Sequence, residues 1–277
     1  MEVLATNGDA LTITATVTPS DATFTWESSD ANVATVENGV VTPKGVGIAI
    51  ITAKSGDVKA TCEVFVGNEV DLGTSAYEAK NYDILKGNMG ANSLTIPAGF
   101  KVAFDGVTAT KQIVCSGDAT IYLADGSTNS VTAVSIDGNA GIKIGGTGTT
   151  LTINGETAGT GQLTAQGGYY AASIGTNYSS YSAVTGGYIV INGGTVTATG
   201  VNYAAGIGTG YSNSSNTCGD ITIGAGVKSV TATKGSYSPY SIGEGYDESG
   251  QDCGTITIGG VVKAQSDFTA ATYTYAP

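Results

Sequence analysis

Hydrophobic and polar residues alternate along the first 66 residues, in pieces too short for helices. Leu11, Ile13, Ala15 and Val17 are each separated by a threonine, and Thr18-Pro19-Ser20 ends the run. A period of two predicts a half-buried strand. Further apolar pieces follow at intervals of about ten residues, with Gly or Pro turns between them; they are Phe24 with Trp26, Val33 with Val36, Val40-Val41, Ile48 to Ile51, and Cys62, Val64 and Val66. This spacing predicts a small β-sandwich that ends near Gly67.

A repeated phrase fills the second half of the chain. Ile189-Val190-Ile191-Asn192-Gly193-Gly194 is followed by Val196-Thr197-Ala198-Thr199-Gly200 and by Tyr203-Ala204-Ala205-Gly206-Ile207-Gly208. The phrase returns from Ile221 and from Ile256, and a less regular copy begins at Leu151. The corresponding isoleucines 153, 191, 223 and 258 are separated by 38 (191 − 153), 32 (223 − 191) and 35 (258 − 223) residues. A period in this range predicts a solenoid of stacked units.

The pattern within each unit predicts three short strands separated by Asn-Gly, Gly-Gly or Thr-Gly turns. A coil of a three-sided parallel β-helix has this form. In the last copy we expect Val262-Lys263-Ala264 to form the second strand, where the previous copy has Val230-Thr231-Ala232. The remaining residues form loops 176–187, 209–219 and 244–254 at one corner. We therefore expect an all-β chain with a sandwich at 1–66, a linker and solenoid cap at 67–93, and a β-helix at 94–277.

The N-terminal region resembles the bacterial group 2 immunoglobulin-like (Big) domain. The resemblance rests on Ala15 to Ala22, Trp26-Glu27-Ser28-Ser29-Asp30, Val33-Ala34-Thr35-Val36, Gly39-Val40-Val41-Thr42, Gly45 to Ala53, and Ala60-Thr61-Cys62-Glu63-Val64. Members of that family usually have one more strand ahead of Leu4. We therefore expect this chain to be a fragment of a longer precursor, with a Met1 that is not native.

The repeats resemble those of right-handed β-helix proteins on the surfaces of gut bacteria, which are often described as carbohydrate-binding. Their Ile-Thr-Ile, Gly-Gly-Thr-Val-Thr-Ala and Ala-Gly-Ile-Gly segments carry the likeness over residues 94–264, together with Ala119 to Asn129. The resemblance implies a right-handed parallel β-helix and an exported, extracellular or cell-surface location.

The composition of the chain argues against several classes of function. The 277 residues include 42 glycines and carry a net charge of −12, which disfavours nucleic acid and anionic membranes as partners. The chain has no histidine, so Ser-His-Asp and Cys-His catalysis and imidazole metal sites are excluded. No apolar run is long enough to cross a membrane, and we expect no direct membrane insertion.

Tyrosines recur at the base of the predicted loops. Tyr178, Tyr211 and Tyr246 each lie four residues after a repeat isoleucine, so stacked coils would arrange them in a ladder about 4.8 Å apart. Tyr181, Tyr169 and Tyr170 lie nearby. Such a surface is a candidate platform for sugar rings, and the alternative is self-stacking that only stabilises the corner.

Cysteines and acids supply two further candidates. Cys218 and Cys253 each lie three residues before a strand isoleucine, so adjacent coils would hold them either as a disulfide or as two stacked thiols. Cys62 and Cys115 have no partner at this spacing and read as buried apolar residues. Glu244, Asp247, Glu248 and Asp252 could chelate Ca²⁺, although their spacing matches no defined calcium loop and solvated surface acids are the alternative. We expect no other cofactor.

These patterns favour a non-catalytic binding protein whose partner is a polysaccharide or a host or cell-surface glycan. The alternatives are an adhesin that binds a surface protein, a passive stalk, and a polysaccharide lyase. Lyases and hydrolases of the β-helix fold need converging acids or a placed base, whereas Asp137, Glu156, Asp220, Lys143, Lys228 and Lys263 are isolated in the sequence.

Overall fold

The computed structural model describes residues 1–16, 23–133, 138–246 and 253–277. Strands make up almost all the regular structure, and the one helix among these residues is the short 3-10 helix η1 (Gln265–Phe268). The prediction of an all-β chain is confirmed. The chain divides into two compact units, one formed by Met1–Val70 with Tyr82–Ile84 and the other by Asp71–Asn81 with Leu85–Pro277. No helix in the described ranges has the length and apolar character needed to cross a membrane.

The first unit contains two sheets. One joins β3 (Thr25–Ser28), β6 (Gly47–Ser55) and β7 (Val58–Asp71) as antiparallel neighbours, and β1 (Glu2–Ala5) pairs parallel with β7. The other is the antiparallel set of β2 (Leu11–Thr12), β5 (Val40–Pro43) and β4 (Ala34–Glu37). Alternate residues from both sheets form one hydrophobic core, which includes Val41, Ala49, Ile51 and Val64, with Trp26 packed against it.

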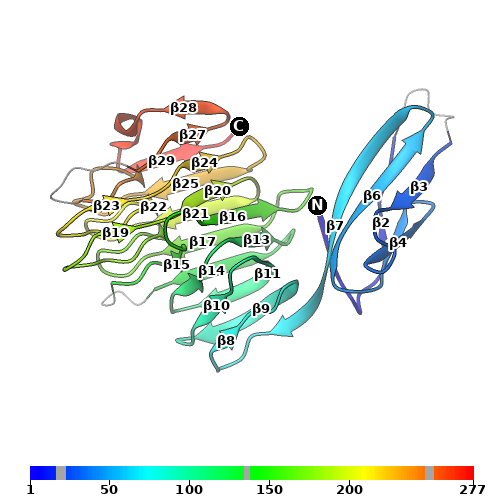
Figure 1. The fold of residues 1–277 in the computed structure, drawn as a ribbon, viewed down its shortest axis with the longest axis horizontal. Coiled ribbons are helices and arrows are strands. Elements are labelled where there is room, and N and C mark those ends of the chain that lie inside the picture. Colours follow the sequence, from blue (N-terminus) through cyan, green and yellow to red (C-terminus); the bar gives the residue numbers. More distant parts are fainter. Residues whose placement is uncertain (17–22, 134–137, 247–252) are drawn as a thin grey trace. The chain divides into compact units, whose positions relative to one another are not determined.

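The second unit is built from three columns of parallel strands, and the chain passes through the columns in turn (Figure 1). The first column contains β11 (Phe100–Ala109), β13 (Ala119–Leu123), β16 (Thr150–Gly155), β20 (Tyr188–Ile191), β24 (Ile221–Ile223) and β27 (Ile256–Ile258). The second contains the end of β11, then β14 (Thr128–Thr132), β17 (Gln162–Gln166), β21 (Thr195–Thr199) and β25 (Ser229–Thr233). We call one pass through the columns a coil.

The third column contains β8 (Tyr77–Glu78), β10 (Leu94–Ile96), β12 (Ile113–Cys115), β15 (Ile142–Lys143), β18 (Ile174–Gly175), β22 (Ile207–Gly208) and β26 (Ile242–Gly243). The segment expected to be a linker and cap is therefore divided, since β8 is the first member of this column while Tyr82–Ile84 belongs to the first unit. Asp83 and Ile84 are the first two residues of β9 (Asp83–Gly90).

The repeat isoleucines pair in register, as the sequence period predicts. Ile153 pairs with Ile191, Ile191 with Ile223, and Ile223 with Ile258. All four are buried, so each coil places the same side chain directly above its counterpart in the coil before. The corner after the third column requires glycine, because Gly175 and Gly208 have positive φ and a Cβ on either would overlap the carbonyl oxygen of the glycine in the next coil.

The last copy of the repeat departs from the prediction. Val262-Lys263 does not form a second-column strand, because β28 (Val261–Lys263) turns back and pairs antiparallel with β27. The reason is the Gly259-Gly260 turn, in which both residues have positive φ, as the type I′ turn of a two-residue hairpin requires. The strand β29 (Thr272–Tyr275) lies beside β25 instead, antiparallel to it.

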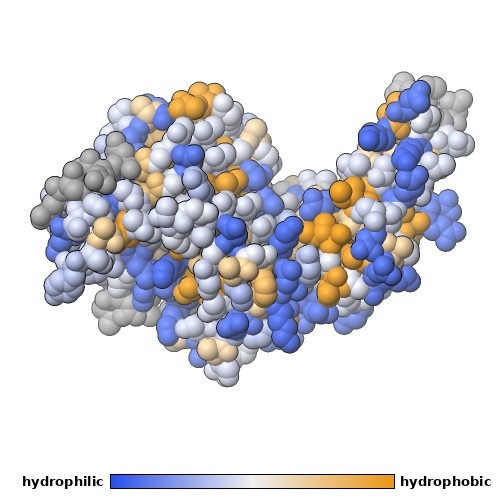
Figure 2. All heavy atoms as spheres, viewed as in Figure 1, coloured by the Kyte–Doolittle hydropathy of each residue, from blue (hydrophilic) through white to orange (hydrophobic). Residues whose placement is uncertain are grey.

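These C-terminal elements cover the end of the stack. Phe268 of η1 is fully buried, its carbonyl oxygen accepts a hydrogen bond from the Ser241 backbone N–H, and η1 packs against β26. The Lys234 ammonium donates to the carbonyl oxygens of Pro239 and Thr269, which fastens the same end. A small hydrophobic patch is visible over β28 in Figure 2, where Val261 and Val262 are 57% and 68% exposed. Covering a terminal coil protects its free strand edge from pairing with other chains.

Candidate ligand-binding surface

Loops of successive coils stack on one another beside the third column. β19 (Val184–Thr185) in one loop pairs parallel with β23 (Asn216–Thr217) in the next, and a further bridge joins Ser179 to Ser212. The loops are thus ordered extensions of the coils, visible at the β19 and β23 labels in Figure 1. Residues 247–252 of the third loop lie outside the described part of the chain.

The predicted tyrosine ladder is present as a row of ring contacts. The ring centroids of Tyr178 and Tyr211 are 5.6 Å apart and their planes differ by 6°. Those of Tyr211 and Tyr246 are 5.9 Å apart, with planes tilted by 36°. Residues four positions after each repeat isoleucine therefore come together, and we call this set the first tyrosine row.

A second tyrosine row runs beside the first. The ring centroids of Tyr170 and Tyr203 are 5.2 Å apart, and those of Tyr203 and Tyr237 are 4.9 Å apart. Sequence reasoning singled out Tyr170 but missed Tyr203 and Tyr237 as site residues. A signal was available, because Tyr170 and Tyr203 lie four residues before Ile174 and Ile207, while Tyr237 lies one residue further from Ile242.

The two rows contact each other within each coil and between coils. Tyr170 lies 5.2 Å from Tyr178 in its own coil and 5.4 Å from Tyr211 in the next, measured between ring centroids. Tyr203 repeats the arrangement, at 5.2 Å from Tyr211 and 5.4 Å from Tyr246. Aromatic pairs at these separations attract one another beyond their buried area, so the rows form one continuous cluster.

Backbone hydrogen bonds fix the positions of the rows. The Tyr211 N–H donates to the carbonyl oxygen of Tyr170 in the previous coil, at 2.8 Å. The Tyr246 N–H donates in the same way to Tyr203, at 2.7 Å. Tyr211 and Tyr246 are thus each tied to the second-row tyrosine of the coil before, whereas the Tyr178 N–H donates to the carbonyl oxygen of Gly138. These bonds hold the backbone below the rings without using the tyrosine side chains.

The surface is open and polar at its rim. Tyr237 and Tyr246 are 63% and 42% exposed, and the remaining tyrosines of the two rows are half-buried. Tyr169, which contacts Tyr170 beside the second row, is 44% exposed. The Tyr211 hydroxyl donates to the side-chain oxygen of Asn213. Tyr181, a predicted ligand residue, is 98% exposed and makes no ring contact within the described ranges, so it stands apart from the cluster.

A hydrogen bond between the hydroxyls of Tyr169 and Tyr170 raises the pKa of Tyr170. The Tyr170 hydroxyl donates a hydrogen bond to the Tyr169 hydroxyl at 3.0 Å, and their ring centroids are 3.9 Å apart. This hydrogen bond, assisted by burial and by neighbouring tyrosines, raises the pKa of Tyr170 to about 12. Tyr170 therefore stays neutral throughout the physiological pH range.

The acidic loop can be followed only in part. Glu244 is buried, with 5% of its surface exposed, whereas Asp247, Glu248 and Asp252 lie outside the described residues. Within the described ranges no three His, Cys, Asp or Glu side chains are gathered as a metal ion would require.

The cysteines lie where the repeat places them. Cys218 and Cys253 form a disulfide between neighbouring coils, with Cα atoms 4.5 Å apart. Cys62 and Cys115 are free thiols. Burial raises the pKa of Cys115 to about 12, so this thiol is unreactive near neutrality.

Two of the isolated acids have local structural roles. The Asp220 carboxylate accepts a hydrogen bond from the Thr255 N–H at 2.7 Å, and the Glu156 carboxylate accepts one from the Asp125 N–H. Both contacts join neighbouring coils. Asp137, the third acid of that set, lies outside the described residues.

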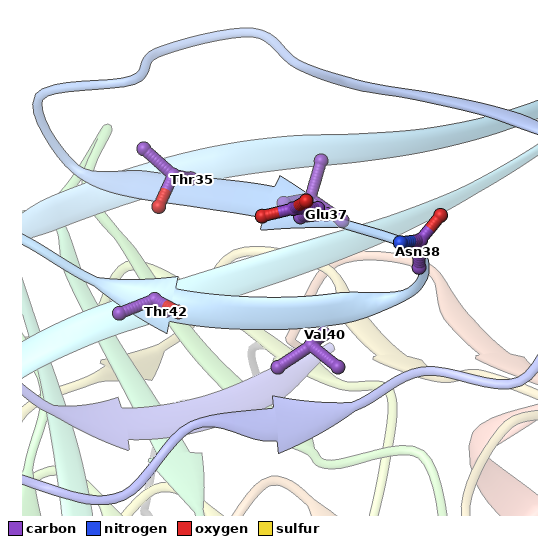
Figure 3. Close-up of a pocket in the computed structure, with 6 residues that line it drawn as sticks. Thr35, Glu37, Asn38, Val40 and Thr42 are labelled. Carbon is purple, nitrogen blue, oxygen red and sulfur yellow. The ribbon is translucent and has the colours of Figure 1, made fainter.

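The first unit has a shallow hollow of about 470 Å³ over the hairpin of β4 and β5. Figure 3 shows Thr35 and Glu37 on β4, Asn38 at the turn, and Val40 and Thr42 on β5. The hollow lacks the aromatic rings of the second unit, and the tyrosine rows are the stronger candidate for a binding surface.

Comparisons with protein-family models, with curated proteins and with solved structures gave no match.

Proposed function

We propose that this chain is a non-catalytic, exported surface protein that binds polysaccharide or cell-surface glycan through the two tyrosine rows. The observation that carries the proposal is the gathering of Tyr170, Tyr178, Tyr203, Tyr211, Tyr237 and Tyr246 into one cluster on stacked coils. Tyrosine offers an apolar ring for stacking and a hydroxyl for hydrogen bonding, which suits sugars that have both apolar faces and hydroxyl groups.

The proposed architecture is a Big-type immunoglobulin-like domain followed by a right-handed parallel β-helix. Two sheets around a shared core support the first assignment, and three columns of parallel strands support the second. In this arrangement the sandwich acts as a spacer or docking module. The disulfide between Cys218 and Cys253 supports an exported location, because such bonds persist mainly outside the cytosol.

Binding would be multivalent. Each coil contributes a similar weak contact, and the fixed backbone keeps those contacts in line, so several contacts along one polymer strengthen each other through effective concentration. The same geometry would suit adhesion to a glycan-coated surface.

One observation favours a second candidate, the passive stalk. Tyr178 and Tyr211 lie with nearly parallel planes in mutual contact, as rings do when they only stabilise a corner. A stalk predicts that removing these tyrosines lowers stability and changes no binding.

The test is a broad polysaccharide and glycan array probed with the wild-type chain and with a Tyr178→Ala/Tyr211→Ala/Tyr246→Ala variant, each with calcium and with chelator. Tyr188→Ala is the matched control, because Tyr188 is 40% exposed on β20 and lies outside the two rows. We expect the triple variant to keep the circular dichroism of the wild type and to lose binding, while the control binds normally. Calcium dependence would assign a role to the acidic loop.

Failure of every glycan to bind the wild type would refute the proposal and favour the stalk or a protein-binding adhesin. Equal binding by the triple variant would place the glycan site elsewhere on the chain.

A further inference from the structure

The direction of the two tyrosine rows limits the shape of a ligand. Both rows run along the stacking direction, and each advances by one coil for every tyrosine. Neighbouring coils are about 4.8 Å apart, the separation of paired strands. Successive ring centroids within the rows are 5.2 Å (Tyr170 to Tyr203), 5.6 Å (Tyr178 to Tyr211), 4.9 Å (Tyr203 to Tyr237) and 5.9 Å (Tyr211 to Tyr246) apart. An extended ligand with a repeat close to these distances would meet each coil in the same way.

An extended polysaccharide has this form. A pyranose chain in an extended conformation advances by nearly the same length for each sugar unit, and its rings expose apolar C–H faces to aromatic neighbours. A single sugar could contact only one coil. The three coils that hold Tyr178, Tyr211 and Tyr246 would accept a short run of consecutive sugars from within a longer chain.

The charges of the protein limit the chemistry of that chain. The sequence has no arginine and no histidine, and its net charge is −12. Arginine is the residue best suited to hold carboxylate and sulfate groups, because its planar guanidinium donates two parallel hydrogen bonds. Lys234, which lies in the last coil, already donates to the carbonyl oxygens of Pro239 and Thr269. Uronate, sulfated and sialylated glycans would meet net repulsion from the chain, with no arginine fork to offset it.

We propose that the two tyrosine rows bind one extended, uncharged polysaccharide chain along the stacking direction, with about one sugar unit for each coil. This inference rests on the proposed function and adds the class, the orientation and the length of the ligand. The polar groups at the rim, such as Asn213 beside the Tyr211 hydroxyl, supply neutral hydrogen-bonding partners for sugar hydroxyls.

The test is isothermal titration calorimetry of the full chain with soluble oligosaccharide series, each running from disaccharide to octasaccharide. Neutral cello-, xylo-, manno- and malto-oligosaccharides are compared with oligogalacturonates as the anionic probe. We expect at least one neutral series to bind, with affinity rising about two- to tenfold for each added sugar until the chain spans the three coils, and level thereafter.

A variant that lacks the tyrosines of one coil tests the proposed length of the binding surface. In a Tyr237→Ala/Tyr246→Ala variant, the last coil loses two exposed rings (63% and 42%) without removing a core residue. The chain length at which affinity levels off should fall by about one sugar unit in this variant and stay unchanged in Tyr188→Ala.

The outcomes separate this inference from the proposed function. Binding of oligogalacturonate in preference to every neutral series, or equal affinity for disaccharide and octasaccharide, overturns the inference while glycan binding itself stands. An unchanged length dependence in the shortened variant also overturns it. If neither the array nor any series shows binding, both proposals fail.

Discussion

At the scale of single residues, the backbone of each tyrosine in the cluster holds neighbouring coils together, while its ring is available for other contacts. Backbone hydrogen bonds such as Tyr211 N–H to the Tyr170 carbonyl hold the coils together, and the rings then project from an already fixed framework. Truncating an exposed ring should leave these backbone bonds in place. Loss of binding in such variants therefore reports on the ligand contact, because the coil itself is retained.

The hydroxyl pair of Tyr169 and Tyr170 predicts an unusual titration. The neutral form of Tyr170 is favoured in the folded protein, so its pKa lies near 12 instead of the usual 10.0. Because the folded-state pKa is raised, the stabilising contribution is complete below about pH 10 and is lost as pH rises through about 12. We expect Tyr169→Phe to remove the acceptor and lower the Tyr170 pKa.

The measurement is an NMR titration of ring-labelled tyrosine in the wild type and in Tyr169→Phe. A Tyr170 resonance that titrates at the same pH in wild type and in Tyr169→Phe would show that the hydrogen bond between the two hydroxyls is not the cause of the shift.

The first tyrosine row could be predicted because its spacing from the repeat isoleucines never changes. Tyr178, Tyr211 and Tyr246 all lie four residues after an isoleucine, and equal spacing in a stacked repeat becomes contact. The second row has one irregular member, since Tyr237 lies five residues before Ile242 while Tyr203 lies four before Ile207. The last coil has one more residue between its second-row tyrosine and its isoleucine, so a search for constant spacing does not find this row.

At the scale of elements, the strand pairing in the middle of the stack could be predicted from the sequence repeat, whereas the pairing at its C-terminal end could not. Ile223 and Ile258 were expected to pair and do so, because each coil provides the template for the next. Val262 was expected to continue the pattern, but no further coil follows β27, and the Gly259-Gly260 turn reverses the chain. Two glycines between apolar residues are a hairpin signal, which the repeat alignment obscured.

The disulfide fastens the same terminal coil. Cys218 and Cys253 lie three residues before β24 and β27, and they close a loop of 35 residues. In the chain-entropy description, a loop of this length corresponds to a contribution of about 3–4 kcal/mol to the free energy of unfolding. We expect a Cys218→Ala/Cys253→Ala variant to lose about this amount, with the loss concentrated at the C-terminal end.

Hydrogen exchange checks that expectation residue by residue. The amides of β26 and β27 should exchange faster in the variant and in reduced wild type, while those of β12 and β13 keep their protection. Equal protection of β26 and β27 with and without the disulfide would mean that the hairpin and η1 hold the last coil unaided.

At the scale of the whole molecule, charge and architecture act together. A net charge of −12 sets up a negative field around the chain, and this field repels anionic polymers at a distance. The two tyrosine rows themselves offer aromatic rings and neutral polar groups at short range. If the proposed surface binds glycans, this combination would select neutral ligands by repulsion of charged ones as much as by attraction, which is a common way to obtain specificity.

This selection has a measurable consequence in salt. Ionic strength screens interactions between charges, and the Debye length falls from about 30 Å at 0.01 M to about 8 Å at 0.15 M. The dissociation constant for a neutral oligosaccharide should therefore change by less than about twofold between these conditions, because no ion pair forms or breaks on binding. Added salt should strengthen any residual binding of oligogalacturonate, since it screens the repulsion. Calorimetric titrations at the two salt concentrations test this expectation. A neutral oligosaccharide whose affinity fell steeply with salt would contradict it, because its binding would then be coupled to the release or uptake of ions, which contact with tyrosine rings does not require.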